Sequence, residues 1–399
     1  MKKILSLLLA ATLVMGCLVG CGGGGNNGGS NAGGDEEYKV AMITDYGDIT
    51  DQSFNQTTYE ACKAFCEANK IEFKYFKPTA NTTSDRVKSV ELAVDEGYNV
   101  IVMPGYSFGG TIAEVSEEYS DIKFIALDVA AGDLLEAAVA NAGEEYDYNP
   151  ANWDLEEYVY MDNVYCAIYQ EELSGYMAGY AAVKLGYKEL GFLGGMAVPA
   201  VMRFGYGFVQ GADDAAAETG ATVNIKYAYG NQFQGDPDIT AVMDTWYKGG
   251  TEIVFACGGG IYTSAAESAQ KTNGKIIGVD TDQAAVIDGD YGKGITITSA
   301  MKGLYPTTYD TLTDVLINGN WDNYAGKIST LGLVSGTDPE ANYVQLPMET
   351  TLWEDGKFSQ DDYKALVAAM FDGTIEVSND ISKEPTVEKI TVEWLGNLK

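Results

Sequence analysis

An apolar strand followed by a polar loop and then a helix occurs twice in the chain, about 150 residues apart. In the first half, the apolar run 40–44 leads into the loop 45–55 and a helical pattern. In the second half, the run 190–194 leads into the loop 195–204 and another helix. Self-similarity at a fixed spacing indicates a repeated architecture. We therefore expect the chain to fold into two similar lobes.

The correspondence between the two halves continues beyond this loop. The glycine-containing segments 103–110 and 256–263 each follow an apolar run, and Asp128 and Asp280 each end one. A phenylalanine precedes each aspartate, by 74 residues in the first half and 76 in the second. In α/β sheets, ligands bind at the carboxyl ends of the strands, where these residues fall. Each lobe should thus offer a phenyl ring, a glycine loop and a carboxylate at one edge of its sheet.

The amino-terminal segment has the pattern of a secretory signal. Two lysines in residues 1–3 precede a short apolar run over 4–16, which is too short to span a membrane. Residues 18–21 then match a bacterial lipobox, which predicts a signal peptide over 1–21 and lipidation of Cys21. Cys17 is the weaker candidate for lipidation, and an ordinary signal peptide is the other alternative.

Residues 22–37 are rich in Gly and Asn and cannot bury a core, so we expect a flexible tether. Stable anchoring requires more than one acyl chain. These features predict an extracytoplasmic protein that is lipid-anchored to the bacterial cell membrane.

About 360 residues follow the tether, which is more than one core usually holds. Continuous apolar runs alternate with helical patterns, and this alternation is typical of parallel sheets covered on both faces. We expect an α/β fold with two Rossmann-like lobes of five strands each. The first lobe would comprise 38–165 with about 302–328, and the second 166–301 with about 329–399. The expected strands are 39–44, 71–76, 99–103, 123–127 and 159–166, then 189–193, 222–227, 252–256, 275–279 and 294–299.

Two segments depart from this pattern. Residues 143–162 carry seven acidic and five aromatic side chains between the fourth and fifth strands. We expect a solvated surface insertion; a lid over the cleft or a patch for a partner is the alternative. In the tail from about residue 330, a helix over 361–370 and a strand over 389–394 are expected to pack on the second lobe.

Composition excludes several classes of function. The formal net charge of −33 argues against nucleic-acid binding, which requires basic patches, and solubility suffices to explain most surface carboxylates. The chain has no histidine and no paired Cys-x-x-Cys, so we expect no metal and no cofactor. The four cysteines after the signal should be small buried hydrophobic residues rather than disulfides: Cys62, Cys66, Cys166 and Cys257.

Several segments together resemble the basic membrane protein family of ABC-transporter substrate-binding lipoproteins, and in particular its purine-nucleoside-binding branch. They occur in the order of the family and span about residues 38–310. The resemblance implies the type I periplasmic-binding-protein fold. The insertion 143–162 and the tail depart from the family pattern. The segments are 51–55, 169–179, 194–199, 203–204 with 207–208, 278–283 and 298–302.

The resemblance also implies roles for residues in both lobes. Phe54 and Phe204 would sandwich a planar base, and base–aromatic stacking contributes ~1–3 kcal/mol per base. Gly258 would let the backbone approach the ligand or the other lobe. A phosphate cradle at 258–260 is the alternative, but the loop lacks the G-x-G-x-x-G spacing.

Polar residues complete the implied site. Asp45 and Asn55 would hydrogen-bond the ligand from the first lobe, while Asp128, Asp280 and Lys302 would hold the sugar hydroxyls or the base edge. An ionised carboxylate accepts hydroxyl donors with charge-assisted strength, whereas a phosphate would be repelled. The alternative roles are structural: each phenylalanine could belong to the core, Asp45 or Asp51 could cap a helix or turn, and Lys302 could lie on the surface.

Three functions are compatible with these residues. The first is capture of a nucleoside-like ligand, with purine nucleosides first, and its delivery to a membrane permease. Riboflavin, another nucleobase-like metabolite or a small furanose are alternative ligands. The second is a surface sensor or adhesin. The third is an enzyme such as an N-ribosyl hydrolase, for which the sequence supplies no histidine, metal cluster or Gly-x-Ser-x-Gly motif. We expect a monomeric binding protein and no catalysis.

Overall fold

Apolar runs in the first part of the chain form the strands of a six-stranded parallel sheet. The computed structural model describes residues 37–399, and Tyr38–Lys399 form one unit. The predicted signal, Cys17, Cys21 and nearly all of the tether lie outside the described residues, so lipidation stays a prediction. The sheet has the order β11-β5-β4-β3-β1-β2. Its strands are β1 (Lys39–Ile43), β2 (Glu72–Phe76), β3 (Val100–Pro104), β4 (Lys123–Leu127), β5 (Val164–Tyr169) and β11 (Lys327–Leu331).

A second sheet of seven strands has the order β12-β10-β9-β8-β6-β7-β13, and only the β10–β12 pair is antiparallel. The two sheets confirm the α/β fold with two lobes. The strands of the second sheet are β6 (Glu189–Gly194), β7 (Val223–Tyr229), β8 (Ile253–Cys257), β9 (Lys275–Asp280), β10 (Thr296–Lys302), β12 (Val344–Gln345) and β13 (Ile390–Asn397).

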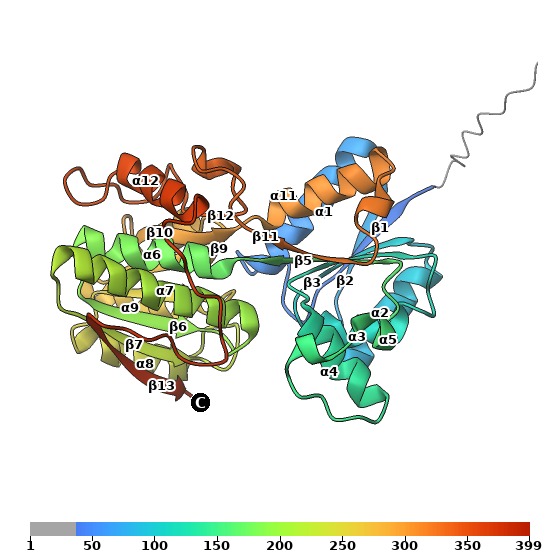
Figure 1. Ribbon diagram of the computed structural model, residues 1–399, viewed down its shortest axis with the longest axis horizontal. Helices are drawn as coiled ribbons and strands as arrows, with labels where there is room; N and C mark the ends of the chain where they lie inside the picture. The colour runs from blue at the N-terminus through green and yellow to red at the C-terminus, as the bar shows by residue number, and fades with distance from the viewer. Residues whose placement is uncertain (1–36) are drawn as a thin grey trace, which may run out of the picture. The chain divides into compact units, whose positions relative to one another are not determined.

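Helices connect the strands and cover both sheets (Figure 1). Side chains cap several of them; for example, the Thr82 hydroxyl accepts the Asp85 N–H at the start of α2. The helices of the first lobe and the insertion are α1 (Phe54–Asn69), α2 (Thr83–Asp95), α3 (Phe108–Val115), α4 (Ala131–Asn141), η1 (Pro150–Asn152) and α5 (Leu155–Tyr158). Those of the second lobe are α6 (Glu171–Leu185), α7 (Pro199–Thr219), α8 (Pro237–Lys248), α9 (Tyr262–Thr272) and α10 (Ala284–Tyr291). The later helices are α11 (Leu304–Leu312), η2 (Thr313–Ile317), η3 (Trp321–Asn323), η4 (Pro339–Ala341) and α12 (Gln360–Phe371).

The chain changes sheet three times, after β5, after β10 and after β11. After the second change, α11 lies beside α1 of the first lobe (Figure 1). Backbone hydrogen bonds tie the crossing segments together: Gln170 N–H donates to Leu331 O over 2.9 Å, and Tyr343 N–H donates to Gly332 O over 3.0 Å. From this pairing, we propose that the first lobe extends to Tyr169 and resumes over 303–331.

The expectation of five strands in each lobe was wrong, because β11, β12 and β13 add strands from the later part of the chain. The fifth strand begins at Val164 instead of residue 159. Residues 155–158 form the short helix α5, and Val159 and Met161 are buried in the core without belonging to a strand. The prediction therefore placed the start of this strand too early, because it relied on apolar side chains alone.

The acidic insertion 143–162 packs against α4. Tyr146, Trp153 and Tyr158 form a small cluster with Leu135 and Val139, while most of the other side chains of the insertion are exposed. The residues that line the cleft described below all come from outside 143–162. This placement favours a surface insertion over a lid.

The tail packs on the second lobe, as expected. Helix α12 buries Tyr363 and Val367 in the core of that lobe, and β13 pairs with β7 at the edge of its sheet. The four cysteines of the described residues are buried and free, which confirms the prediction that they are not in disulfides.

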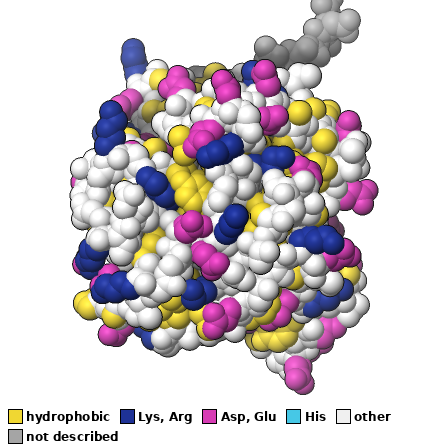
Figure 2. Space-filling model, turned by 90° about the vertical axis from the view of Figure 1, so that its left-hand side faces the viewer, with side chains coloured by type: hydrophobic (Ala, Val, Ile, Leu, Met, Phe, Trp, Pro, Cys, Tyr) yellow, Lys and Arg dark blue, Asp and Glu magenta, His cyan; other side chains and the backbone are white. Residues whose placement is uncertain are grey.

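Acidic and basic side chains are intermixed on the face shown in Figure 2. This face carries no extended basic area of the kind that binds nucleic acid.

Helices α6 and α7 contact each other through their backbones. A Cβ at Gly207 would lie 2.0 Å from Glu172 O, and one at Gly175 would lie 2.1 Å from Phe204 O. Gly179 and Gly211 make equally close contacts with the facing helix. These four glycines allow a helix separation that no larger residue would permit.

We expect Gly207→Ala to lower the free energy of unfolding by about 2 kcal/mol, because its methyl group would force the two helices apart. The matched control is Gly289→Ala in α10, where the site is exposed and no atom lies within 4 Å of an added Cβ. There, the higher helix propensity of alanine should stabilise by up to about 1 kcal/mol. Urea unfolding of both variants checks the prediction, and equal stability changes would contradict it.

Candidate functional site

A cleft lies between the carboxyl ends of the two sets of strands. All eight residues predicted as ligand contacts line it: Asp45, Phe54, Asn55, Asp128, Phe204, Gly258, Asp280 and Lys302. Residues that were not predicted also line it, among them Tyr46, Tyr106, Asp133, Arg203, Phe233 and Gln234. The fold thus brings residues from distant parts of the sequence together at the edge where α/β sheets bind ligands.

The two strand-end aspartates have the same unusual backbone conformation. Asp128 follows β4 with a φ of 58°, and Asp280 ends β9 with a φ of 66°. This left-handed region costs an ordinary L-residue roughly 1–2 kcal/mol, although Asp tolerates it better than most. Such conformations concentrate at functional sites. Their equivalent positions in the two lobes agree with the repeat seen in the sequence.

Lys302 lines the cleft with three carboxylates around its ammonium group. Its ammonium group forms an ion pair with Asp128 and lies 3.6 Å from Asp280 Oδ1 and 3.5 Å from Glu171 Oε1. The residue is 5% exposed, so the alternative of a surface lysine was wrong. A lysine buried to this extent requires several carboxylates around it.

The phenyl rings of Phe54 and Phe204 both face this ammonium group. The centres of the rings lie 4.7 and 5.6 Å from Lys302 Nζ, and the Tyr169 ring lies at 5.6 Å. Phe54 is half-buried, whereas Phe204 is 1% exposed and also packs against Phe255. Two rings from opposite lobes therefore face the same ammonium group, and Phe204 contributes to the core as well.

Side chains of the first lobe hold the loop before α1. Asp51 accepts backbone N–H groups of Ser53, Asn55 and Gln56, each over 3.0 Å, so Asp51 caps α1. Asp45 Oδ1 accepts the N–H groups of the next two residues and, over 3.3 Å, the amide of Asn55. Both aspartates therefore have the structural role that was considered for them, and both also line the cleft.

Two buried acceptors in the cleft have no hydrogen-bond partner among the described residues: Asn55 Oδ1 and Asp128 Oδ1. An unsatisfied buried acceptor costs ~1–3 kcal/mol. Both residues line the cleft, so a bound molecule with hydroxyl or amino donors could satisfy these atoms. This arrangement suits a neutral ligand rich in donors.

The glycine loop after β8 contacts its own lobe. A Cβ at Gly258 would lie 2.9 Å from Gly195 Cα, so only glycine lets the two loops of the second lobe meet. Lys302 and Arg203, the cations that line the cleft, are both engaged with carboxylates. The loop is therefore poorly suited to cradle a phosphate.

Glu171 and Arg203 complete the charged cluster, and no role was predicted for either residue from the sequence. Both residues lie in segments that resemble the family, and this resemblance was the signal in the sequence that could have identified them. Glu171 begins α6 and is fully buried, and its Oε2 accepts Arg203 Nε–H over 2.6 Å. Ser53 was also missed; its hydroxyl donates to Asp280 Oδ2 over 2.6 Å.

Burial and neighbouring charges shift the pKa values of this cluster in opposite directions. Burial opposes the charge on Lys302, but the facing carboxylates Asp128, Asp280 and Glu171 together raise its pKa. Burial also acts against ionisation of Glu171, yet Arg203 and Lys302 hold its pKa below the usual value. Glu171 and Lys302 are therefore charged in the folded protein near neutral pH.

Two other carboxyl groups behave differently. Burial raises the pKa of Glu172 to about 7, and burial likewise raises the pKa of Asp133 to about 7. Glu172 Oε2 is buried without a partner among the described residues, so little compensates the loss of solvation. These groups are partly protonated near neutral pH.

Among the described residues, no group of His, Cys, Asp and Glu side chains has the arrangement of a metal site. In the same part of the chain, no helix is both long and apolar enough to cross a membrane.

Comparison with known proteins identifies relatives of the chain. It is 24% identical over 260 residues to the ABC transporter nucleoside-binding protein BmpA of Lactococcus lactis, a match over 62% of this chain and 65% of BmpA. The chain thus spans just under two thirds of the length of this relative. It is also 26% identical over 320 residues to the CD4+ T-cell-stimulating antigen of Listeria monocytogenes, covering 75% and 80% of the two chains.

A solved structure shares the fold. The ABC transporter system solute-binding protein from Aeropyrum pernix K1 superposes with a TM-score of 0.61 at 17% identity, over 85% of this chain and 87% of that one. The model of the Bmp family, described as ABC transporter substrate-binding protein PnrA-like, matches residues 38–337. Because this match covers most of the sequence, the chain belongs to the Bmp family of ABC transporter substrate-binding proteins.

Proposed function

We propose that this protein captures a nucleoside-like molecule, with purine nucleosides first, between its two lobes and delivers it to a membrane permease. The observation that carries the proposal is that the rings of Phe54 and Phe204, from opposite lobes, both face Lys302 in a cleft that Asn55 and Asp128 also line, each with a buried acceptor that has no partner among the described residues. The rings suit a planar base, and the acceptors suit hydroxyl or amino groups. BmpA of Lactococcus lactis, which is named as nucleoside-binding, supports the same ligand class.

Contacts between the lobes support a mechanism of closure around the ligand. The Ser53 hydroxyl reaches Asp280 over 2.6 Å, and Gln283 Nε2 donates to Gln52 O over 3.0 Å. Each bond joins the start of α1 in the first lobe to the end of β9 or the loop after it in the second. A ligand that contacts both lobes would favour this closed arrangement, because it gains contacts there that an open form lacks.

Carboxylates outnumber cations along the cleft, which disfavours nucleotides. Asp45, Asp51, Asp128, Asp133 and Asp280 line it together with only two cations. A phosphate would meet these acids at close range. Riboflavin remains the second ligand candidate, and its planar ring system would use the same two phenyl groups. We also propose a lipid anchor at Cys21, which would keep the protein near its permease.

A titration panel tests the proposal. Isothermal calorimetry with protein lacking residues 1–37 would use adenosine, guanosine, adenine, riboflavin, ribose and AMP. We expect a nucleoside to bind most tightly and AMP to bind at least tenfold more weakly than adenosine. Tight binding of ribose but of no planar compound would refute the proposal. Binding should also raise the melting temperature by mass action.

Removing either ring should weaken binding of the nucleoside tenfold or more, because base–aromatic stacking contributes ~1–3 kcal/mol. Phe54→Ala suits the half-buried ring. Phe204→Leu is preferable at the second site, because the side chain also fills the core and alanine would leave a cavity. Calorimetry measures both effects. Unchanged isotherms in both variants would eliminate the stacking model.

A further inference from the structure

The loop between β7 and α8, residues 230–236, brings a third phenyl ring to the cleft. Phe233 and Gln234 both line it, and neither was predicted from the sequence. The Phe233 ring is half-buried and packs on the core of the second lobe. The stacking proposed above uses only Phe54 and Phe204, so the role of the Phe233 ring requires a separate account.

Phe233 covers the backbone of the two glycine-containing loops of the second lobe. A Cβ at Gly195 would lie 2.4 Å from Phe233 Cδ1, and a Cβ at Gly258 would lie 3.0 Å from the same atom. A side chain at either glycine would therefore displace the ring. The two glycines create the space that the ring fills.

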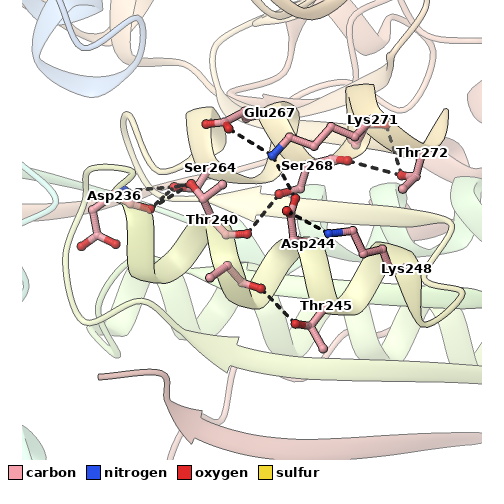
Figure 3. A network of polar contacts seen from close by, with 12 residues as sticks. Asp236, Thr240, Asp244, Thr245, Lys248, Ser264, Glu267, Ser268, Lys271 and Thr272 are labelled. Carbon is pink, nitrogen blue, oxygen red and sulfur yellow. Dashed lines mark hydrogen bonds and ion pairs between the residues drawn. The ribbon is translucent and has the colours of Figure 1, made fainter.

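Hydrogen bonds hold the 230–236 loop in place. Gln232 Nε2 donates to Gln234 O and to Asp236 Oδ2, each over 2.8 Å, and Gln234 forms a parallel bridge with Gly260. Asp236 in turn caps α8, with Oδ1 accepting Ile239 N–H over 2.8 Å. The Asp236 backbone N–H donates to Ser264 Oγ of α9 over 2.9 Å (Figure 3). Hydrogen bonds thus fix the 230–236 loop to α8 and α9, and the loop in turn fixes the position of Phe233.

The tail adds a further support to this loop. Strand β13 extends the sheet beside β7, and Leu398 N–H donates to Tyr229 O over 2.8 Å, directly before the loop. Lys399 forms an ion pair with Asp236. All of these tail residues lie beyond residue 337, where the match to the family model ends. The contacts that support the 230–236 loop from the tail therefore come from outside the part of the chain that the family model matches.

We propose that Phe233 is a specificity-determining residue of the cleft, which limits the size of the ligand at the second-lobe wall, and that Lys399 helps to position its loop. The proposal rests on the function proposed above. Phe54 and Phe204 would select a planar base, whereas Phe233 would exclude substituents that extend toward Gly195 and Gly258. Truncating this ring would open space beside the two glycine loops without touching the charged cluster around Lys302.

The test compares wild type with Phe233→Ala by calorimetry against adenosine and adenosine analogues that carry one benzyl-sized group at N6, C8 or the 5′ oxygen. We expect wild type to discriminate against the analogues. In Phe233→Ala, the affinity of at least one analogue relative to adenosine should rise tenfold or more. Selectivity that is the same in both proteins overturns the proposal. Failure of wild type to bind any nucleoside instead refutes the proposed function itself.

A second variant tests the contact that positions the ring. Gly195→Ala should weaken adenosine binding at least fivefold, because its methyl group would push Phe233 from its place. In the Phe233→Ala background, the same substitution should have no further effect, because the obstructing ring is absent. If the effects of the two substitutions on adenosine affinity are additive, the methyl group at position 195 does not act through the Phe233 ring, and this part of the proposal is overturned.

The role of the tail has a matched pair of lysine variants. Lys399→Ala removes the ion pair with Asp236, and Lys271→Ala removes ion pairs with Asp244 and Glu267 at the other end of α8 and α9 (Figure 3). We expect Lys399→Ala to shift the selectivity two- to threefold in the direction of Phe233→Ala, and Lys271→Ala to leave it unchanged. Equal selectivity of both variants would refute a positioning role for Lys399.

Discussion

Replacing Lys302 with methionine should lower the free energy of unfolding by ~3–5 kcal/mol at pH 7.5. The substitution preserves most of the side-chain volume but removes the charge that faces Asp128, Asp280 and Glu171. Glu171 and Asp280 are buried and the Asp128 side chain is only 11% exposed, and in the variant only Arg203, paired with Glu171, would remain to compensate them. An uncompensated buried charge costs far more than an exposed ion pair contributes.

Urea unfolding followed by circular dichroism measures this effect, with Lys271→Met as the control. The Lys271 ammonium also contacts two carboxylates, but its side chain is 41% exposed, so its loss should change stability little. The deficit of Lys302→Met should shrink at pH 5, because protonation of the unpaired carboxyl groups relieves the repulsion. A deficit equal to that of the control would show that the cluster around Lys302 contributes little to folding.

Glu172→Gln should stabilise the protein by about 2–3 kcal/mol at pH 8 and leave its stability unchanged at pH 4. Burial raises the pKa of Glu172 from 4.5 to about 7. Between these two values, the folded state binds more protons than the unfolded state, so wild-type stability falls as the pH rises from 4.5 to 7. A shift of this size corresponds to about 3 kcal/mol above pH 7. The neutral amide keeps the shape of the side chain and removes this cost.

The adjacent residue provides a control of opposite sign. Glu171 pairs with Arg203 over 2.6 Å and faces Lys302 at 3.5 Å, and its pKa is lowered. Glu171→Gln should therefore destabilise the protein at pH 8, although the two glutamates are neighbours at the start of α6. Urea unfolding between pH 4 and 8 distinguishes them. A loss of stability in Glu172→Gln at pH 8 would mean that its carboxylate has a partner that stabilises the charge.

The repeat in the sequence was sufficient to predict the main residues that line the candidate site. Parallel strands that are buried on both faces read as continuous apolar runs, and their carboxyl ends fall at one edge. Asp128 and Asp280 could therefore be assigned to that edge from local pattern alone. The phenyl rings needed the comparison of the two halves, because Phe204 by itself is equally consistent with a core residue.

Other features depended on contacts between distant segments. Two strands, β11 and β12, were missed in the sequence; they join their sheets by pairing with β5 and β10, which occur earlier in the chain. A strand over 389–394 was expected, but its pairing with β7 as β13 was not. Phe233 carries no local signal of its position, since only the packing of the 230–236 loop against Gly195 and Gly258 brings it to the cleft. Pairing and packing of this kind depend on contacts between residues that are far apart in the sequence, and local patterns do not indicate such contacts.

The sequence by itself determined the two-lobed α/β design and the sheet edge at which the candidate site lies, because local patterns of hydrophobicity indicate which strands are buried and where they end. Only the tertiary structure decided how the charges are balanced. The charged cluster draws its members from three elements: Glu171 from α6, Arg203 from α7 and Lys302 from the end of β10. Because they are buried together, the charge on each residue is stabilised by the opposite charges of its neighbours. Electrostatic energy in a buried cluster is set by distances of a few ångströms, and these distances exist only once the lobes have folded and met.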